Sequence, residues 1–322
     1  MKKAVVTGAA GFIGSHLCEK LLSLGYEVIG IDCFTDYYSP ELKKRNLLQF
    51  SSDERFKLCK LNLVTDSLEG LLEDAEFIFH LAAQPGVRNS WGNSFETYVQ
   101  NNIIATQRLL EQIKEMDIRK LIFASSSSVY GNLHVPSLRE DMLLRPVSPY
   151  GVTKLASERL VHVYWENFGL PVISLRFFSV FGPRQRPDMA FQRLIDAALN
   201  GKEFTVYGDG SQTRDFTFVS DAVQACVNAA LYERKGEVYN VGGGNIASVN
   251  EVVAMVREIT GSHLTPRYVE PQKGDVAHTC SDITKARKEI RFTPEVSLFD
   301  GLRRQIEYHS RVVLQKGTPY RT

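Results

Sequence analysis

The stretch Thr7-Gly8-Ala9-Ala10-Gly11-Phe12-Ile13-Gly14 decides the fold that we expect for this chain. It lies between an apolar strand at residues 3–6 and an apolar helical pattern that runs to Leu24, and a second strand at residues 26–31 ends at Asp32. Glycines in such a turn let the backbone approach a pyrophosphate at a helix N-terminus, and an acid after the second strand suits a ribose 2′-hydroxyl. Because that acid repels a 2′-phosphate, the pattern predicts NAD rather than NADP. The alternative is a glycine turn without a ligand.

Further strands follow along the first half of the chain. We expect them at residues 56–61, 77–81 and 120–124, alternating with helices, of which the longest covers residues 94–116. This alternation predicts an α/β fold with a Rossmann-type, doubly wound parallel sheet, whose ligands bind at the carboxyl ends of the strands. The residues at those ends are therefore candidates for a site.

Two of these strand ends carry residues that suit a cofactor. Asn62 follows one strand, where its amide is placed to bond adenine. The stretch His80-Leu81-Ala82-Ala83 closes another, and its two alanines would admit a cofactor closely. For His80 itself we favour a core or helix-packing histidine over a catalyst.

The strand at residues 120–124 ends in Ser125-Ser126-Ser127-Ser128-Val129-Tyr130-Gly131. Four hydroxyl residues after an apolar strand form either a polar loop or a set of donors at an active site. We favour the second interpretation, because a serine at this edge of a doubly wound sheet can hydrogen-bond a reacting hydroxyl.

The stretch Ser148-Pro149-Tyr150-Gly151-Val152-Thr153-Lys154 is typical of a helix start. Its serine can cap the free amides, and its proline fits the first helical position. Tyr150 and Lys154 are four residues apart and share one helix face. Because an ammonium beside a phenol lowers the pKa of the phenol, we expect Tyr150 to act as a general base near neutral pH. The alternative is an ordinary surface pair.

The composition excludes several classes of protein. Of the 322 residues, 43% are hydrophobic and 23% are charged, and the net charge of +1 predicts no binding to nucleic acid or to anionic membranes. The N-terminus leads directly into a strand, and no apolar run is long enough to span a bilayer, so we expect neither a signal peptide nor a membrane span. Five scattered cysteines without metal-ligand spacing predict reduced thiols, a cytoplasmic protein and no metal site.

The second half of the chain leaves the strict alternation of strands and helices. We expect residues 1–180 to form a dinucleotide-binding domain, to which roughly residues 216–241 return. Residues 181–215 and 242–322 would form a smaller, interleaved α/β lobe that binds the substrate. A capping box at residues 248–251 predicts the start of one helix in that lobe.

Three features together resemble the extended short-chain dehydrogenases/reductases: the glycine turn, the serine cluster and the Tyr-x-x-x-Lys pair. From end to end the chain resembles the NAD-dependent nucleotide-sugar epimerases and dehydratases of that superfamily. Further matches lie at Arg176-Phe177-Phe178, Gly182-Pro183, Tyr207-Gly208-Asp209-Gly210 and Arg214-Asp215-Phe216. The resemblance implies a catalytic triad of Ser126, Tyr150 and Lys154. It implies NAD contacts at Gly8, Gly11, Phe12, Ile13, Gly14, Asp32, Asn62, Leu63, Leu81, Ala82, Ala83, Asn102, Tyr150, Lys154 and Phe177.

The resemblance also implies a mechanism. Tyr150 takes a proton from a sugar hydroxyl at C4 while a hydride passes to NAD, and the 4-keto sugar turns over and receives the hydride on its other face. Related dehydratases and decarboxylases carry an acid after the catalytic Ser or Thr. Here Ser127 and Ser128 stand in those places, which disfavours both reactions. A catalytically silent NAD sensor is disfavoured because Tyr150 and Lys154 are both present.

The expected substrate rests on three stretches that resemble the UDP-glucuronate 4-epimerases: Pro85-Gly86-Val87-Arg88, Ser179 and Arg184-Gln185-Arg186-Pro187-Asp188-Met189. Ser127, Ser128 and Ser179 would present hydroxyls to a C6 carboxylate, with help from Arg88. Hydroxyls hold a carboxylate less rigidly than a bidentate arginine, which suits an intermediate that must rotate. We therefore expect UDP-glucuronate, with UDP-glucose or UDP-N-acetylglucosamine as alternatives.

The remaining expectations concern the nucleotide and the assembly. Arg186 and Arg214 are candidates for the substrate diphosphate, and Asp275 matches a family position near the nucleotide ribose. The family resemblance implies a homodimer, formed by pairing the helix at residues 94–116 and the helix that begins at Pro149 with their copies.

Overall fold

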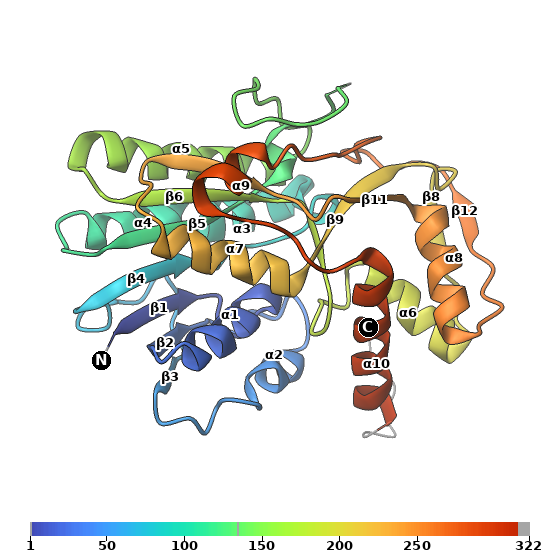
Figure 1. Ribbon diagram of the computed structural model, residues 1–322, viewed down its shortest axis with the longest axis horizontal. Coiled ribbons are helices and arrows are strands. Elements are labelled where there is room, and N and C mark those ends of the chain that lie inside the picture. The colour runs from blue at the N-terminus through green and yellow to red at the C-terminus, as the bar shows by residue number, and fades with distance from the viewer. Residues whose placement is uncertain (1, 134, 315–322) are drawn as a thin grey trace.

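The computed structural model describes residues 2–133 and 135–314. Within these ranges the main sheet has seven strands, all parallel, in the order β10-β6-β5-β4-β1-β2-β3 (Figure 1). This confirms the Rossmann-type, doubly wound sheet that the alternating pattern predicts. The strands are β1 (Lys3–Thr7), β2 (Glu27–Ile31), β3 (Phe56–Cys59), β4 (Ala75–His80), β5 (Lys120–Ser126), β6 (Val172–Phe177) and β10 (Glu237–Val241).

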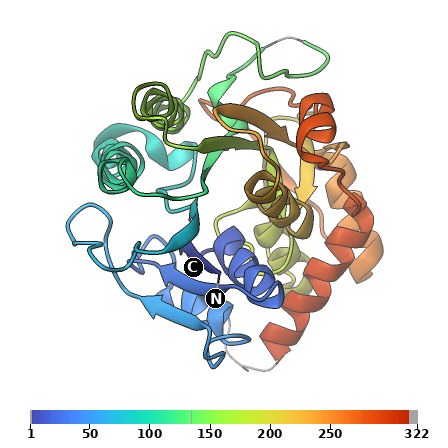
Figure 2. The ribbon, with the colours of Figure 1, turned by 60° about the vertical axis from the view of Figure 1, so that its left-hand side comes forward.

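Helices cover both faces of the main sheet, as a parallel sheet requires (Figure 2). One face packs against α1 (Phe12–Ser23) and α7 (Val219–Leu231), and its core includes Leu17 and Phe79. The opposite face packs against α4 (Ala105–Ile113) and α5 (Pro149–Phe168), with a separate apolar core. A short helix, α2 (Pro40–Leu47), lies beside α1.

The long helix expected at residues 94–116 differs from the observed structure. The segment consists of α3 (Phe95–Tyr98), a π-helical stretch η3 (Val99–Ile104) and then α4. An extra residue per turn in a π-helix re-aims side chains, and such turns are frequent at functional sites. Here the π-helical stretch carries Asn101 to the wall of the central cavity and Asn102 behind it.

The helix that begins at Pro149 forms as predicted. Ser148 Oγ accepts a hydrogen bond from the Gly151 amide at 3.1 Å, and Pro149 occupies the first helical position. The helix ends at Phe168, and Gly169 follows it in the left-handed conformation with φ 67°. Both ends are therefore set by local sequence.

A smaller lobe lies at the other end of the molecule, to the right in Figure 1. It contains a three-stranded sheet, in the order β11-β9-β7, and a two-stranded sheet of β12 and β8. Its elements are β7 (Ser179–Phe181), α6 (Ala190–Asn200), β8 (Thr205–Tyr207), β9 (Thr213–Phe218), β11 (Asn245–Ser248), α8 (Val249–Thr260), β12 (Arg267–Val269) and α10 (Leu298–Leu314). The predicted capping box at the start of α8 is present, with Ser248 and Glu251 bonding each other's amides.

The domain boundaries remain a proposal, which the chain path supports. After β9 the chain returns through α7 to β10, which pairs with β6 in the main sheet. It then leaves again for β11, and α9 (Thr284–Ile290) packs back against β10 and α7. The C-terminal tail of residues 315–322, which the expected lobe included, lies outside the described residues.

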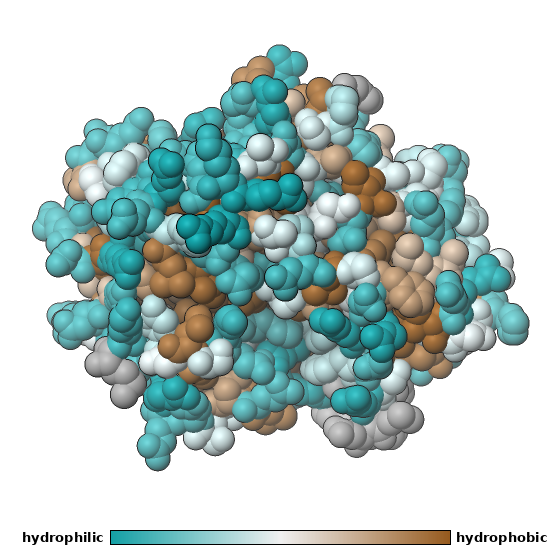
Figure 3. Space-filling model, viewed as in Figure 1, coloured by the Kyte–Doolittle hydropathy of each residue, from teal (hydrophilic) through white to brown (hydrophobic). Residues whose placement is uncertain are grey.

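Hydrophilic residues predominate on the face of the molecule in Figure 3, and apolar residues form scattered patches. Among the described residues, no helix combines the length and apolar character that crossing a membrane requires.

Candidate active site

A cavity of about 390 Å³ opens at the carboxyl ends of β1, β2, β4, β5 and β6. Most of the residues expected at the cofactor and the reacting sugar line this one cavity. They are Gly8, Gly11, Phe12, Ile13, Gly14, Asp32, Asn62, Leu63, Leu81, Ala82, Ala83, Ser126, Ser127, Ser128, Tyr150, Lys154, Phe177, Ser179 and Arg186. Four expected residues do not line it: Arg88, Asn102, Arg214 and Asp275.

The glycine turn leaves no room for side chains where a dinucleotide would approach. A Cβ at Gly14 would lie 2.1 Å from the Gly8 carbonyl oxygen, so α1 can pack this closely only on glycine. Gly8 has φ +71°, and a Cβ there would lie 2.9 Å from the Ala82 amide nitrogen. The bare backbone at the α1 N-terminus therefore fits the pyrophosphate of NAD.

Asp32 directly follows β2 and lines the cavity beside the glycine turn. Its carboxylate accepts hydrogen bonds from the Ala10 amide at 3.1 Å and the Phe34 amide at 2.8 Å. Lys43 Nζ lies 3.9 Å from it, comes from α2 and is almost fully buried. Sequence analysis missed Lys43 because α2 was not predicted, although the Pro40 helix start was a usable signal.

His80 is a packing residue, as the sequence favoured. Its Nδ1 lies 2.8 Å from the Thr7 hydroxyl, and its Nε2 lies 2.9 Å from the Thr106 hydroxyl. Thr106 donates its own proton to the Asn102 carbonyl, so His80 must donate from Nε2 and accept at Nδ1. Burial lowers the pKa of His80 to about 3, and the imidazole is neutral.

Ser126 and Tyr150 line the same cavity, and their side chains lie within hydrogen-bonding reach of each other. Ser126 is the last residue of β5. Its Oγ accepts a hydrogen bond from the Ser128 amide at 3.1 Å, which fixes the serine turn. The Tyr150 ring packs edge-on against Tyr98 at a centroid distance of 6.2 Å.

The expected lowering of the Tyr150 pKa by Lys154 is not found. Burial raises the pKa of Tyr150, while Ser126 and the Arg186 guanidinium oppose that rise. The physical reason is that desolvation of the phenolate outweighs the nearby favourable groups.

Lys154 is buried on the same helix face, one turn after Tyr150. Its Nζ lies 4.4 Å from the centroid of the Phe123 ring. Burial lowers the pKa of Lys154 to about 7, against the opposing effect of the Glu158 carboxylate. The charge of this lysine thus depends on its surroundings near neutral pH.

Asn102 lies behind the cavity wall rather than in it. Its side chain accepts the Gln84 amide at 2.7 Å and donates to the Gln84 carbonyl and to Thr153 Oγ1. These bonds tie the π-helical stretch to the loop after β4 and to α5. Asn101, which the sequence analysis did not single out, lines the cavity in its place.

Arg88, Arg214 and Asp275 line a second cavity of about 240 Å³. The Arg88 Nη2 donates to Asp275 Oδ2 at 2.7 Å, and its guanidinium lies 4.2 Å from the Tyr207 ring centroid. Arg88 thus shares the second cavity with Ser179, whereas Ser127 and Ser128 line the first. The two cavities share Ser179, Val180 and Met189 and adjoin along one cleft.

Arg186 comes from the loop before α6 and reaches the first cavity. Its guanidinium bonds both oxygens of Asp188 at 3.0 Å. Tyr37, from the loop after β2, donates to the same carboxylate at 3.3 Å. Tyr37 and Tyr38 line the cavity and were missed, because they stand in a loop without a recognisable motif.

Comparisons with known proteins agree with this site. The family model of the NAD dependent epimerase/dehydratase family matches residues 4–242. The chain is 49% identical over 311 residues to the uncharacterized UDP-glucose epimerase YtcB of Bacillus subtilis, covering 96% of this chain and 98% of that protein. It is 36% identical over 309 residues to a UDP-glucuronate 4-epimerase of Thermodesulfobacterium geofontis, covering 94% and 95%.

A solved structure gives the same result for the fold. The UDP-glucuronic acid 4-epimerase from Bacillus cereus, in complex with UDP-glucuronic acid and NAD, superposes with a TM-score of 0.94 at 45% identity. The match covers 96% of this chain and 99% of that one. These similarities extend over nearly the whole chain, including the glycine turn, the serine turn and the Tyr150–Lys154 pair. The chain therefore belongs to the NAD dependent epimerase/dehydratase family and is an NAD-dependent epimerase.

Proposed function

We propose that this chain is a UDP-sugar 4-epimerase that interconverts UDP-glucuronate and UDP-galacturonate. The observation that carries the proposal is the composition of the first cavity. Ser126, Tyr150 and Lys154 share it with Ser127, Ser128 and Ser179. Bound NAD would accept the C4 hydride of the sugar and later return it.

The residues of the chain would handle the proton and the sugar. Tyr150 Oη removes the proton of the C4 hydroxyl, with Ser126 bonding the same oxygen, and returns the proton after the keto sugar has turned over. Lys154 would contact NAD and, when charged, would stabilise the Tyr150 phenolate. Burial raises the pKa of the Tyr150 phenol, and the Ser126 hydroxyl and the Arg186 guanidinium oppose that rise.

The same cavity supports epimerisation over elimination. Asp32 is the only carboxylate among the described residues that line this cavity. It lies at the glycine turn, where the cofactor would bind. Ser127 and Ser128 stand where an acid would act on C5 or C6. Loss of carbon dioxide from a 4-keto uronate would be disfavoured by the lack of an acid there and by serine hydroxyls that restrain the carboxylate.

The uronate assignment rests on the three hydroxyls of Ser127, Ser128 and Ser179. They would hold the C6 carboxylate, while Arg186 and Arg214 bind the diphosphate and Asp275 the ribose. Arg88 belongs with these nucleotide contacts by its position in the second cavity. The rival substrate is UDP-glucose, which the name of the relative at 49% identity favours.

Incubation of the purified protein with UDP-glucuronate, without added NAD, tests the proposal. NMR should identify UDP-galacturonate. A UDP-pentose would mean decarboxylation, and turnover of UDP-glucose alone would overturn the uronate. Tyr150→Phe should lower kcat by roughly a thousandfold while NAD stays bound; turnover at the wild-type rate would contradict the role of Tyr150.

We also propose a homodimer formed through α5 and the α3–α4 segment. Three apolar residues of α5 support it: Val152 and Val163 are 47% exposed, and Phe168 is 51% exposed. Light scattering of Val163→Lys should show a lower mass than the wild type; an unchanged dimer would exclude this face. The cytoplasmic location expected from the cysteines stays a prediction.

A further inference from the structure

Three buried polar residues lie in register across three strands of the main sheet. Ser125 of β5 pairs with Arg176 of β6, and Arg176 pairs with Asn240 of β10. All three are buried, with at most 4% of each residue exposed. Register partners on parallel strands present their side chains to the same face of a sheet, so these residues form one polar row.

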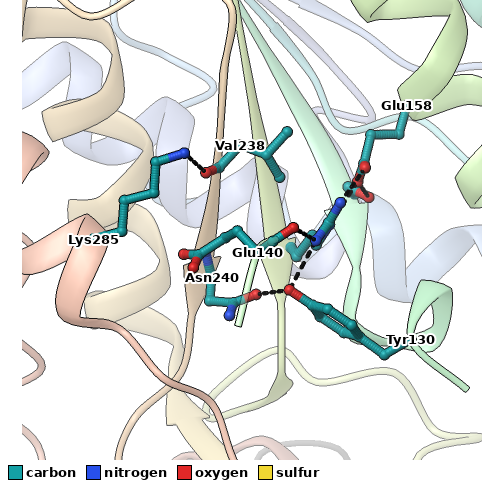
Figure 4. A network of polar contacts seen from close by, with 8 residues as sticks. Tyr130, Glu140, Glu158, Val238, Asn240 and Lys285 are labelled. Carbon is teal, nitrogen blue, oxygen red and sulfur yellow. Dashed lines mark hydrogen bonds and ion pairs between the residues drawn. The ribbon is translucent and has the colours of Figure 1, made fainter. Parts of the chain in front are cut away.

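The polar row closes on Glu158, a buried carboxylate of α5 (Figure 4). Ser125 Oγ donates to Glu158 Oε2 at 2.5 Å, and Arg176 donates to both carboxylate oxygens at 3.0 and 2.6 Å. At the other end, Tyr130 accepts from Arg176 Nη1 at 2.8 Å and donates to Asn240 at 2.7 Å. Every charge in the row is paired, which a buried site requires.

This row begins at the wall of the active site. Ser125 precedes Ser126 on β5, and both residues line the cavity, while the Ser125 hydroxyl bonds Glu158 of α5. Glu158 stands four residues after Lys154, so the two side chains share a helix face. The row therefore fixes the strand end and the helix that together carry the triad.

The charged and titratable groups around Lys154 are few. Tyr150 and Glu158 face it from α5, and His80 faces it from β4 as a neutral ring. Arg176 of β6 lies beyond Glu158, to which it is bonded. From β5, Lys154 meets the Phe123 ring, which carries no formal charge. Glu158 is thus the negative charge that opposes desolvation of the Lys154 ammonium.

We propose that Glu158, held in place by Ser125 and Arg176 one helical turn after Lys154, is a positioning residue that keeps the Lys154 amino group charged at the cofactor cavity. The inference rests on the proposed epimerase only for its kinetic readout, because NAD retention is measured without any sugar. Glu158 itself does not line the cavity.

Glu158→Gln tests this inference by removing the charge and keeping the shape. Loss of the carboxylate should lower the pKa of Lys154, so the alkaline fall of kcat should begin roughly one pH unit lower than in the wild type. In dialysis at pH values from about 6 to about 10, the pH above which the variant loses NAD should also be lower than for the wild type. Glu140→Gln is the matched control: its carboxylate accepts the Asn240 amide at the far end of the row, and its profile should remain that of the wild type.

The Glu158→Gln protein leaves Arg176 buried without its partner and could fail to fold for that reason. The double variant Glu158→Gln/Arg176→Met buries no unpaired charge and should show the same shift. The inference would be overturned if kcat and NAD retention decreased by the same factor at every pH, or if both pH profiles matched those of the wild type. If the wild-type protein converts neither UDP-glucuronate nor UDP-glucose, the proposed function fails. NAD retention then tests the role of Glu158 by itself.

Discussion

Arg88 donates to Asp275 at 2.7 Å and so connects the loop after β4 to the loop after β12. The two residues belong to the two halves of the cleft, and Arg214 faces the same carboxylate. Two guanidinium groups that share one carboxylate carry a net positive charge, which suits a diphosphate.

Arg88→Ala should therefore weaken binding of the nucleotide rather than the chemistry. We expect the KM for the UDP-sugar to rise about tenfold and kcat to change little, because a charge-assisted bond made equally in ground and transition states is lost. Steady-state kinetics measures both. Arg139→Ala is the matched control, since Arg139 pairs with Asp141 on the exposed surface. A fall in kcat with an unchanged KM would contradict this role.

Ser179→Asn should change the choice of substrate. The side chain lies where the two cavities meet, and the larger amide would remove a hydroxyl from the proposed carboxylate site. We expect kcat/KM for UDP-glucuronate to fall roughly tenfold more than kcat/KM for UDP-glucose. Parallel assays on the two sugars give this ratio directly. Equal losses on both would remove the carboxylate assignment.

Gly14→Ala should abolish cofactor retention. The new methyl would lie 2.1 Å from the Gly8 carbonyl oxygen, so the turn must open where the pyrophosphate would bind. Nucleotide released by denaturing the purified protein measures the loss. Gly25→Ala serves as the control, because its Cβ would meet nothing within 4 Å, although φ is +84°. That variant should lose about 1 kcal/mol of stability and keep its NAD.

His80 predicts how stability depends on pH. Its pKa in the fold is about 3, against 6.5 for the ordinary side chain. The unfolded chain therefore binds a proton below about pH 6.5 that native His80 does not, and the free energy of unfolding falls as the pH drops toward 3. The full stabilising contribution is present above pH 6.5.

Urea unfolding of His80→Gln at several pH values checks this dependence. The slope between about pH 6 and about pH 5 should decrease by roughly 1 kcal/mol per pH unit. Half-buried His16, whose pKa is lowered to about 4, should supply a remaining slope. An unchanged slope would mean that His80 is protonated in the native protein.

The sequence by itself determined the features that depend on neighbouring residues. The glycine turn, the alternation of strands and helices, the caps of α5 and the serine turn all follow from steric limits and hydrogen bonds within a few positions. These features were sufficient to predict the doubly wound sheet and most residues of the first cavity. The resemblance to a known family then predicted the cofactor, NAD, and the class of reaction, epimerisation.

Only the tertiary structure decided which side chains share a cavity. A π-helical turn places Asn101 rather than Asn102 at the cavity wall, and an ion pair between distant loops holds Arg88 in the second cavity. The pKa of Tyr150 rises because desolvation, which sequence spacing does not reveal, outweighs nearby charge. The row from Ser125 to Asn240 exists because three strands, distant in the chain, pair in one register. Distance and burial are properties of the packed chain, and they set the electrostatics of the site.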